Sequence, residues 1–235
     1  NVDAERIIEA FPERVEVIPV LLDELPERLD RYHYDLVATT TFHADEAQAF
    51  ENFAHAQPDN VVLLIDTYDT EAAAHKVVAL APRLAQDGIR IKAVRLDSGD
   101  LGEHAHKVRA ILDQGGLHET GIFASGNLDE FELARLAAQQ APISGFGVGT
   151  RLLTSSDAPY LDCAYKLQEY AGQARRKRSE GKATWPGRKQ VYRSYDADGC
   201  MAGDVLTVES DRQAGEPLLQ PVMRGGKRLV SSAPL

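Results

Sequence analysis

The sequence predicts an α/β fold of parallel βα units, followed by a smaller β-rich domain. Between residues 45 and 154, short β-branched runs alternate with amphipathic stretches at a spacing of about 30 residues. Consecutive units of this kind form a parallel sheet or barrel with right-handed crossovers. After residue 155 the pattern changes to short apolar runs split by glycines and prolines, which is typical of antiparallel strands.

Four strands and three complete connecting helices are expected in the α/β part, after a first helix at 45–57. The continuous apolar run at 61–66 is typical of a parallel strand that is buried on both faces. Thr70 can cap the helix that follows, and Gly88 lies where its C-cap is expected. The remaining elements, in order, are a strand at 89–94, a helix at 102–114, a strand at 121–125, a helix at 128–140 and a strand at 143–150.

The two ends of the chain have a different character. Residues 1–44 predict an atypical N-terminal α/β segment with strands at 15–20 and 35–39. Residues 155–235 predict an antiparallel β-rich domain that contains a strongly basic run at 174–193. The aromatic residues of this run, Trp185 and Tyr192, are too far apart to stack successive bases. We therefore expect a surface loop that can contact a diphosphate. The β-like runs of this domain are 204–210, 217–223 and 228–232.

Composition narrows the class of protein. The chain has 235 residues, 43% of them hydrophobic, and a net charge of −10. The negative charge disfavours a general nucleic-acid or anionic-membrane surface, and no apolar run approaches the roughly 20 residues of a membrane span. Cys163 and Cys200 form neither a metal-binding spacing nor a disulfide framework. We expect a cytoplasmic protein without nucleic-acid or membrane partners.

A polar or glycine-rich cluster follows each predicted strand of the α/β part. Because successive parallel strands point the same way, these clusters are expected to converge on one face. Glycines and helix N-termini offer N–H groups to a phosphate, while carboxylates suit Mg²⁺ or ribose hydroxyls. Together they predict a site for a phosphorylated sugar. The clusters are Asp66–Thr70, Arg95–Asp100, Ser125–Asn127 and Gly145–Thr150.

Each cluster alone also has a structural interpretation. Asp66 or Asp69 could cap the helix that begins near Thr70. Arg95 could form a structural ion pair with Asp97 or Asp100, and the glycine-rich turns could be turns only. Their joint occurrence at consecutive strand ends is what favours a ligand site.

Five motifs, in order, resemble nicotinate phosphoribosyltransferases over about four fifths of the chain. They are LLIDTYDT (63–70), VRLDSGDLG (94–102), ASGNLDE (124–130), GFGVGTRL (145–152) and SEGKATWPGRKQVYR (179–193). The resemblance implies an irregular TIM-like phosphoribosyltransferase barrel, incomplete in this chain, with a β-rich second domain. It implies the joining of nicotinate to 5-phosphoribosyl 1-diphosphate, giving nicotinate mononucleotide and diphosphate, with ATP hydrolysis. Mg²⁺ and ATP as cofactors and a homodimer are implied in the same way.

The resemblance also implies roles for individual residues. Arg95 matches the arginine that holds the nicotinate carboxylate, for which a guanidinium fork is suited. Asp97 and Asp66 are the candidate catalytic carboxylates, and Thr150 matches the threonine that binds the ribose 5-phosphate. No metal ligand is assigned. The other implied substrate-binding residues are Ser98, Asp100, Ser125, Gly126, Asn127, Gly147 and Gly149.

One part of the family pattern is not found. The family has a Gly-Thr-x-x-His segment whose histidine is phosphorylated by ATP, and His43, which lies nearby, lacks the Gly-Thr context. Two functions therefore stay open: a nicotinate phosphoribosyltransferase, or an inactive or truncated homologue that acts as a nucleotide- or phosphate-binding module. A third option is a related phosphoribosyltransferase that acts on quinolinate or nicotinamide. A dicarboxylate such as quinolinate would want more than one basic residue near Arg95, and none is close in sequence.

Overall fold

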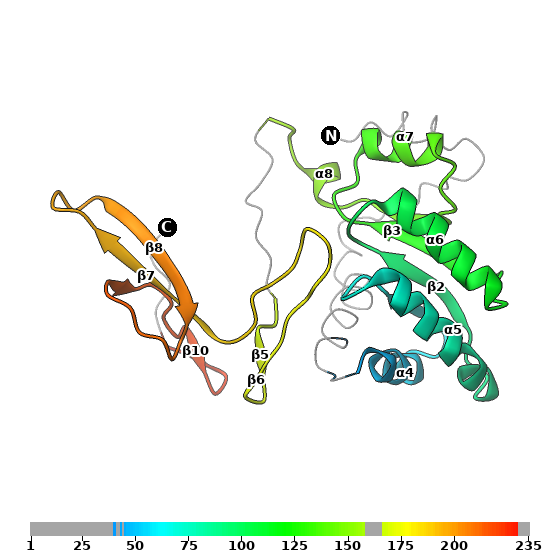
Figure 1. The fold of residues 1–235 in the computed structure, drawn as a ribbon, viewed down its shortest axis with the longest axis horizontal. Coiled ribbons are helices and arrows are strands. Elements are labelled where there is room, and N and C mark those ends of the chain that lie inside the picture. Colours follow the sequence, from blue (N-terminus) through cyan, green and yellow to red (C-terminus); the bar gives the residue numbers. More distant parts are fainter. Residues whose placement is uncertain (1–39, 41–42, 44, 158–165, 230–235) are drawn as a thin grey trace. The chain divides into compact units, whose positions relative to one another are not determined.

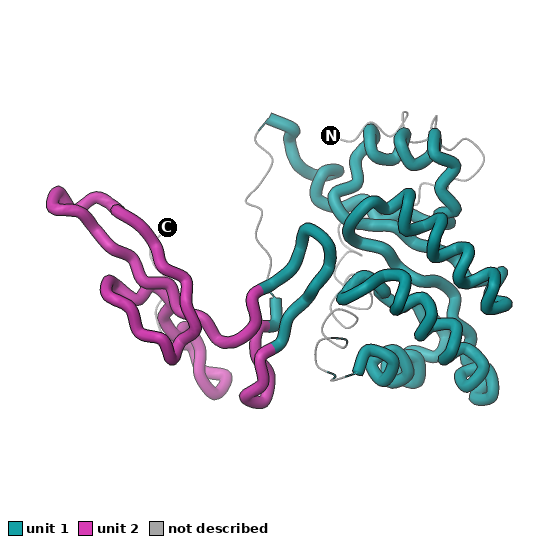
Figure 2. Tube along the Cα trace, in the orientation of Figure 1, with its two compact units in different colours: residues 1–167, 175–184 teal, residues 168–174, 185–235 magenta. Residues whose placement is uncertain are grey.

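The structure is a computed structural model that describes residues 40, 43, 45–157 and 166–229 (Figure 1). The strands expected at 15–20 and 35–39, and Cys163, lie outside these residues. The chain divides into two compact units (Figure 2), the first comprising residues 1–167 and 175–184, the second 168–174 and 185–235. No described helix is long and apolar enough to cross a membrane.

The first unit contains a four-stranded sheet whose strands follow one another in chain order, β1-β2-β3-β4. All three neighbouring pairs are parallel, which confirms the predicted parallel sheet. Because each crossover joins adjacent parallel strands, right-handed connections place the intervening helices on one face. The strands are β1 (Val61–Leu64), β2 (Ile91–Leu96), β3 (Gly121–Ser125) and β4 (Gly145–Gly147).

Strand β4 is shorter than the run at 143–150 that was expected to form it. Its pairing with β3 ends where Ser125 meets Gly147. Beyond that point Gly126 and Asn127 have φ angles of 96° and 53°, so the chain of β3 turns away. With no partner beyond Gly147, the chain leaves the sheet, and Thr150 begins the short helix α8 (Thr150–Leu153).

Four longer helices begin where an aspartate can cap them. Each capping side chain accepts a hydrogen bond from a backbone N–H of the first turn, and such a cap stabilises a helix by about 1 kcal/mol. Asp69, one of the two aspartates considered, caps α5, so the expectation that Thr70 does so is wrong: Thr70 is the first helical residue. The helices, with their caps, are α4 (Glu46–Ala56, Asp45), α5 (Thr70–Gln86, Asp69), α6 (Leu101–Gln114, Asp100) and α7 (Glu130–Ala138, Asp129).

The core of the first unit lies between the sheet and its helices. Helices α4, α5 and α6 lie side by side (Figure 1). Val94 and Leu96 on β2 are fully buried with Val77 of α5 and Val108 of α6. Each such side chain stabilises the fold by about 1.5–3 kcal/mol. This packing fixes the positions of the strand ends, and therefore of the polar residues that follow them.

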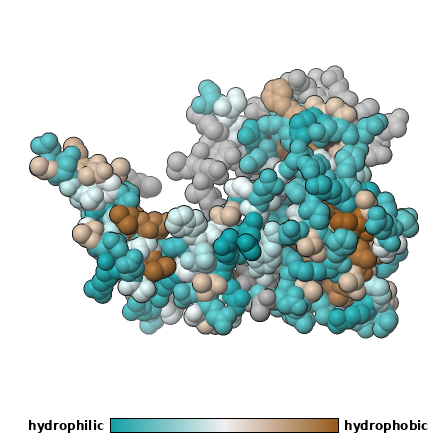
Figure 3. Space-filling model, in the orientation of Figure 1, coloured by the Kyte–Doolittle hydropathy of each residue, from teal (hydrophilic) through white to brown (hydrophobic). Residues whose placement is uncertain are grey.

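The second unit consists of small antiparallel sheets, as the pattern after residue 155 predicts. Strands β7 and β8 pair over seven positions, and β9 adds to the other edge of β7. Apolar side chains remain on its surface (Figure 3), among them Trp185, Leu206 and Val208. Of the expected run 217–223, only its two ends are in strands. The strands are β5 (Glu169–Tyr170), β6 (Gln173–Ala174), β7 (Lys189–Tyr195), β8 (Met201–Val208), β9 (Glu216–Pro217), β10 (Met223–Arg224) and β11 (Lys227–Arg228).

Candidate functional site

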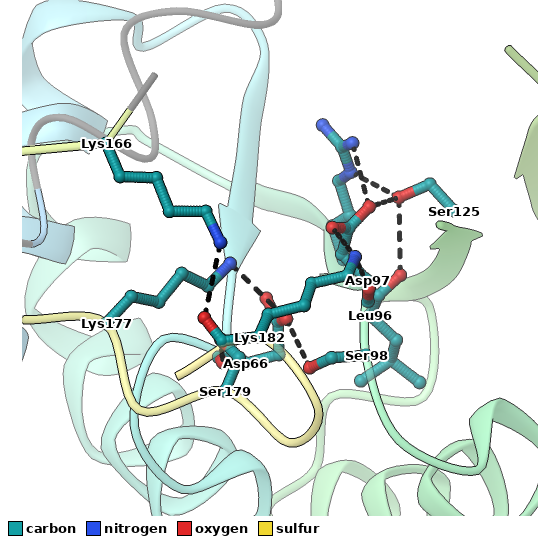
Figure 4. Close-up of polar contacts among 10 residues, drawn as sticks. Asp66, Leu96, Asp97, Ser98, Ser125, Lys166, Lys177, Ser179 and Lys182 are labelled. Atoms are coloured by element: carbon teal, nitrogen blue, oxygen red, sulfur yellow. Dashed lines mark hydrogen bonds and ion pairs between the residues drawn. The ribbon is translucent and has the colours of Figure 1, made fainter. Parts of the chain in front are cut away.

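The carboxyl ends of three neighbouring strands bring five polar side chains together (Figure 4). We call Asp66, Arg95, Asp97, Ser98 and Ser125 the strand-end cluster. Ser98 Oγ donates a hydrogen bond to Asp66 Oδ2 at 2.6 Å, and Ser125 Oγ donates to Asp97 Oδ1 at 2.6 Å. Arg95 donates from Nε to Ser125 Oγ at 2.8 Å and from Nη2 to Asp97 Oδ1 at 3.3 Å. The ion pair between Arg95 and Asp97, considered above as an alternative, is therefore present.

The strand register explains this convergence. Leu64 of β1 pairs with Arg95 of β2, and the N–H of Ile65 donates to the carbonyl of Arg95. Leu96 of β2 pairs with Ala124 of β3. The residues just after these paired positions therefore lie next to one another along the carboxyl edge of the sheet.

A second group of side chains reaches the same edge from the basic loop, residues 175–184. Lys182 Nζ donates to Asp97 Oδ2 at 2.7 Å and also contacts the Asp97 carbonyl. Lys177 Nζ lies 3.5 Å from Asp66 Oδ2, and Ser179 Oγ donates to the Asp66 carbonyl. All of these residues belong to the first unit.

The expectation of a surface loop is therefore wrong for part of the basic run. Lys177 is only 7% exposed and Ser179 only 2%. Asp66 itself is 2% exposed, and a buried carboxylate needs a counter-charge, which Lys177 provides. The neighbours Arg176, Arg178 and Glu180 are exposed, so the segment alternates between buried and exposed positions. Residues 176–180 are all polar in the sequence, so no local pattern distinguishes the buried Lys177 and Ser179 from their exposed neighbours.

Backbone bonds hold the basic loop in this position. The N–H of Arg178 donates to the carbonyl of Thr67 at 2.8 Å. Within the loop, Lys182 N–H donates to Ser179 O at 3.0 Å, and Gly181 has a φ of 67°, as a tight turn with glycine at its third position requires. The N–H of Thr184 donates to Lys177 O, which closes the loop. Both lysines are thus fixed by backbone bonds next to them.

Gly126 permits the close approach of the β2 and β3 strand ends. Its φ is 96°, and a Cβ at this position would lie 2.6 Å from the carbonyl oxygen of Asp97 and 3.2 Å from Lys182 Nζ. No larger residue fits without moving the backbone of Asp97. A glycine is therefore required at this point of the site by both conformation and space.

The surroundings shift the pKa of two charged groups in the site. Burial acts to raise the pKa of Asp97, but hydrogen bonds from Lys182 and Ser125 and the charges of Lys182 and Arg95 outweigh it, so the pKa lies below its ordinary value. Burial lowers the pKa of Lys177, and the carboxylates of Asp66 and Asp97 oppose this effect only in part. Asp97 is thus held ionised, while the charge on Lys177 depends on its neighbours.

Two buried polar atoms at the end of β1 have no hydrogen-bond partner among the described residues. They are Asp66 Oδ1 and Thr67 Oγ1. Buried groups of this kind cost free energy unless a ligand or water satisfies them.

The remaining predicted site residues lie around this cluster. Asp100 caps α6 and lies 3.5 Å from Arg135. Gly147 pairs with Ser125 in the sheet. Gly149 and Thr150 are exposed at the start of α8, and Asn127 is exposed after β3. Among the described residues, no hydrogen bond or ion pair joins Asp100, Asn127, Gly149 or Thr150 to the strand-end cluster.

The cluster does not fit a resident Mg²⁺ ion. Its carboxylates, Asp66 and Asp97, each have a lysine ammonium group beside them. Within the described ranges there is also no group of three His, Cys, Asp or Glu residues that could hold a metal ion. His43 lies next to the start of the basic loop: its carbonyl accepts a hydrogen bond from Arg175 Nη1 at 3.4 Å, and its ring lies 2.7 Å from Asn52.

Comparisons with known proteins agree with the motifs. No protein-family model matches the chain. A nicotinate phosphoribosyltransferase of Mycobacterium tuberculosis is 48% identical over 189 residues, which are 80% of this chain and 40% of that protein. The Bos taurus nicotinate phosphoribosyltransferase is 36% identical over 188 residues, 75% of this chain and 35% of that protein.

A solved structure supports the fold. The crystal structure of nicotinate phosphoribosyltransferase from Vibrio cholerae matches 76% of this chain and 42% of its own length, with a TM-score of 0.50 and 21% identity. The chain spans about 40% of the length of these curated relatives. Over that shared part, this chain belongs to the nicotinate phosphoribosyltransferase family.

Proposed function

We propose that the strand-end cluster is part of the active site of a nicotinate phosphoribosyltransferase. The reaction joins nicotinate to 5-phosphoribosyl 1-diphosphate and releases diphosphate. The observation that carries this proposal is the guanidinium of Arg95, which Asp97 and Ser125 hold at the end of β2. Membership of the family supports it, and the whole reaction is an inference because the chain spans only part of its relatives.

Arg95 is suited to bind the nicotinate carboxylate. Its side chain is 17% exposed, so it is shielded from water but not sealed off. Its bonds within the described chain use two of its five N–H groups, which leaves donors for a ligand. A planar carboxylate can pair with these donors in a bidentate manner, and the partly buried position strengthens that pairing.

The rest of the strand-end face is suited to the phosphorylated sugar. Gly149 has no atom within 4 Å of the place where a Cβ would lie, so a phosphate can approach the backbone before Thr150. Lys166, whose Nζ donates to the carbonyl of Lys182 at 3.3 Å, adds a further positive group near the basic loop. These groups favour an anionic ligand and an anionic leaving group.

In the proposed reaction the pyridine nitrogen of nicotinate attacks the anomeric carbon as its bond to the diphosphate oxygen breaks. The sugar passes through an oxocarbenium-like state, which Asp97 and Asp66 can stabilise by their negative charge. No protein nucleophile is needed, so positioning is the main contribution of the chain. The family resemblance implies Mg²⁺ and ATP as cofactors, and the residues described here do not assign a ligand to either.

We also propose that the sheet of the first unit is a portion of an irregular TIM-like barrel. Its strands follow chain order with one helix per crossover, as in such barrels. The proposed domains are residues 1–44, 45–154 and 155–235. The basic loop, 175–184, lies in the third of these in the sequence but belongs to the first compact unit. A homodimer, which the family resemblance implies, would supply further residues to the site.

A second function is favoured by one observation. Lysines occupy both carboxylates that the reaction would use. The chain could therefore bind nicotinate mononucleotide, or its phosphate, without turnover.

The two functions are separated by measuring product and binding in parallel. The chain is mixed with nicotinate, 5-phosphoribosyl 1-diphosphate, ATP and Mg²⁺, and nicotinate mononucleotide is quantified by chromatography. Product that is lost in Arg95→Lys but retained in Arg83→Lys, an exposed arginine paired with Glu51, supports the enzyme. Calorimetric binding of nicotinate mononucleotide without turnover, lost in Arg95→Lys, supports the binding module. Neither turnover nor binding would refute both.

A further inference from the structure

We infer that the ammonium groups of Lys177 and Lys182 take the place of a divalent cation at Asp66 and Asp97, so that the basic loop and a cation exclude one another. The inference rests on the proposed function for the identity of that cation, Mg²⁺. Its test uses no substrate, so a failure of the inference can be told from a failure of the proposed function.

Both carboxylate oxygens of Asp97 already accept hydrogen bonds from side chains. Oδ2 accepts from Lys182 at 2.7 Å, and Oδ1 accepts from Ser125 at 2.6 Å and from Arg95 at 3.3 Å. A Mg²⁺ ion would have to approach one of these oxygens to about 2.1 Å. At that distance it would meet the charge of Lys182 or Arg95, so it can bind only if one of them moves.

Asp66 is closed to a cation by different means. Its Oδ2 accepts from Ser98 at 2.6 Å and lies 3.5 Å from Lys177 Nζ. The side chains of Lys177 and Asp66 are 9% and 1% exposed, so little water screens the repulsion between Lys177 and an incoming cation. The remaining oxygen, Oδ1, is buried without a hydrogen-bond partner among the described residues, whereas Mg²⁺ usually keeps several of its waters.

The charge balance points the same way. Three cationic groups, Arg95, Lys177 and Lys182, face two carboxylates, which gives these five side chains a net charge of +1 when all are ionised. Such a site attracts an anion and repels a free metal ion. A diphosphate that already carries its cation could still bind, because its own charge is negative.

The lysines are placed there by the fold of the basic loop. Backbone bonds between Arg178 and Thr67, and between Lys177 and Thr184, anchor the segment beside the strand ends. Gly126 leaves space for Lys182 Nζ, since a Cβ there would lie 3.2 Å from it. The two ion pairs are therefore a built feature of the site.

The test titrates the full chain with Mn²⁺ as a paramagnetic substitute for Mg²⁺ and measures free Mn²⁺ by electron paramagnetic resonance. The variants are Lys182→Met, Lys182→Arg and Arg178→Met, an exposed arginine of the same loop. We expect Lys182→Met to bind one Mn²⁺ at least about ten-fold more tightly than the wild type, because a like charge beside the carboxylate is removed. Lys182→Arg and Arg178→Met should match the wild type.

Two further variants locate the site. Asp97→Asn, added to Lys182→Met, should abolish the gained Mn²⁺ site. Lys182→Gln, which is neutral but keeps a hydrogen-bond donor, should gain the same site and replaces Lys182→Met if circular dichroism shows that variant to be unfolded. The inference is overturned if the wild type binds one Mn²⁺ that Asp97→Asn removes, or if a folded neutral variant gains no binding.

Discussion

Lys182 Nζ lies 2.7 Å from Asp97 Oδ2, although the two residues are 85 positions apart in the sequence. The contact joins the basic loop to the end of β2 (Figure 4). Lys182 is 30% exposed and Asp97 is 22% exposed, so the pair is partly shielded from water. It joins two of the five sequence motifs, VRLDSGDLG (94–102) and SEGKATWPGRKQVYR (179–193), in one site.

Removal of Lys182 should destabilise the first unit. Lys182→Met leaves the Asp97 carboxylate without its closest cation, and we expect a loss of about 1–3 kcal/mol, between the values for exposed and buried pairs. Urea denaturation measures the loss. Arg178→Met, in the same loop, removes an exposed side chain and should change stability by less than about 0.5 kcal/mol. Equal losses in the two variants would mean that the ion pair is not the cause.

Asp97 should make the protein sensitive to acid. Its pKa lies below the ordinary 3.8, because the bonds from Lys182 and Ser125 and the nearby charges outweigh burial. A carboxyl with a lowered pKa in the folded state stabilises the protein above its unfolded pKa, and this contribution is lost as the pH falls through the lowered value. The unfolding free energy should thus decrease below about pH 4.

The matched variants for this pH dependence are Asp97→Asn and Asp59→Asn. Asp59 is exposed, so it serves as the control carboxylate. Denaturation curves between pH 6 and pH 3 should show a weaker acid dependence for Asp97→Asn than for the wild type, while Asp59→Asn follows the wild type. An unchanged acid dependence in Asp97→Asn would contradict the role assigned to its ion pairs.

Gly126→Ala should be one of the most damaging small substitutions in the site. The residue has a φ of 96°, and the new Cβ would lie 2.6 Å from the Asp97 carbonyl oxygen. We expect a loss of at least about 2 kcal/mol from strain and overlap together. Gly203→Ala is the control, because Gly203 lies within strand β8 without a left-handed φ, and the nearest atom to its Cβ position is Ser194 Oγ at 3.9 Å. Thermal unfolding of the two variants should differ clearly, and similar melting temperatures would refute the close approach.

The buried sheet should account for much of the stability of the first unit. Leu63 on β1 is 0% exposed, so Leu63→Ala leaves a cavity in the core and should cost about 2–5 kcal/mol. Leu153, on α8, is 74% exposed, and Leu153→Ala should change stability by less than about 0.5 kcal/mol. Urea midpoints give both values. A small effect of Leu63→Ala would show that β1 does not belong to the cooperative core.

Arg95→Lys should weaken the binding of nicotinate more than the stability of the protein. Lysine keeps the charge but cannot pair with a carboxylate through two parallel bonds. We expect the dissociation constant for nicotinate to rise by about ten-fold or more, which corresponds to the loss of one charged hydrogen bond. Isothermal calorimetry measures it, with Arg83→Lys as the control. An unchanged affinity would remove Arg95 from the proposed nicotinate site.

Local patterns predicted most elements of the first unit. The apolar run at 61–66 and Gly88, which has a φ of 76° after the end of α5, are signals that depend on only a few neighbouring residues. The end of β4 was placed three residues too late because it depends on where β3 turns away, at Gly126. At that turn the chain passes close to the carbonyl of Asp97. Local periodicity cannot predict such a contact, because the two residues are far apart in the sequence.

The sequence by itself determined the order of the parallel units, the family, and the placement of Asp66, Arg95, Asp97 and Ser125 at strand ends. These features follow from short-range periodicity and from the common direction of parallel strands. Only the tertiary structure decided that Lys177 and Lys182 neutralise the two aspartates. A charge in a sequence does not specify its partner, and these partners meet only because the basic loop folds back over the sheet.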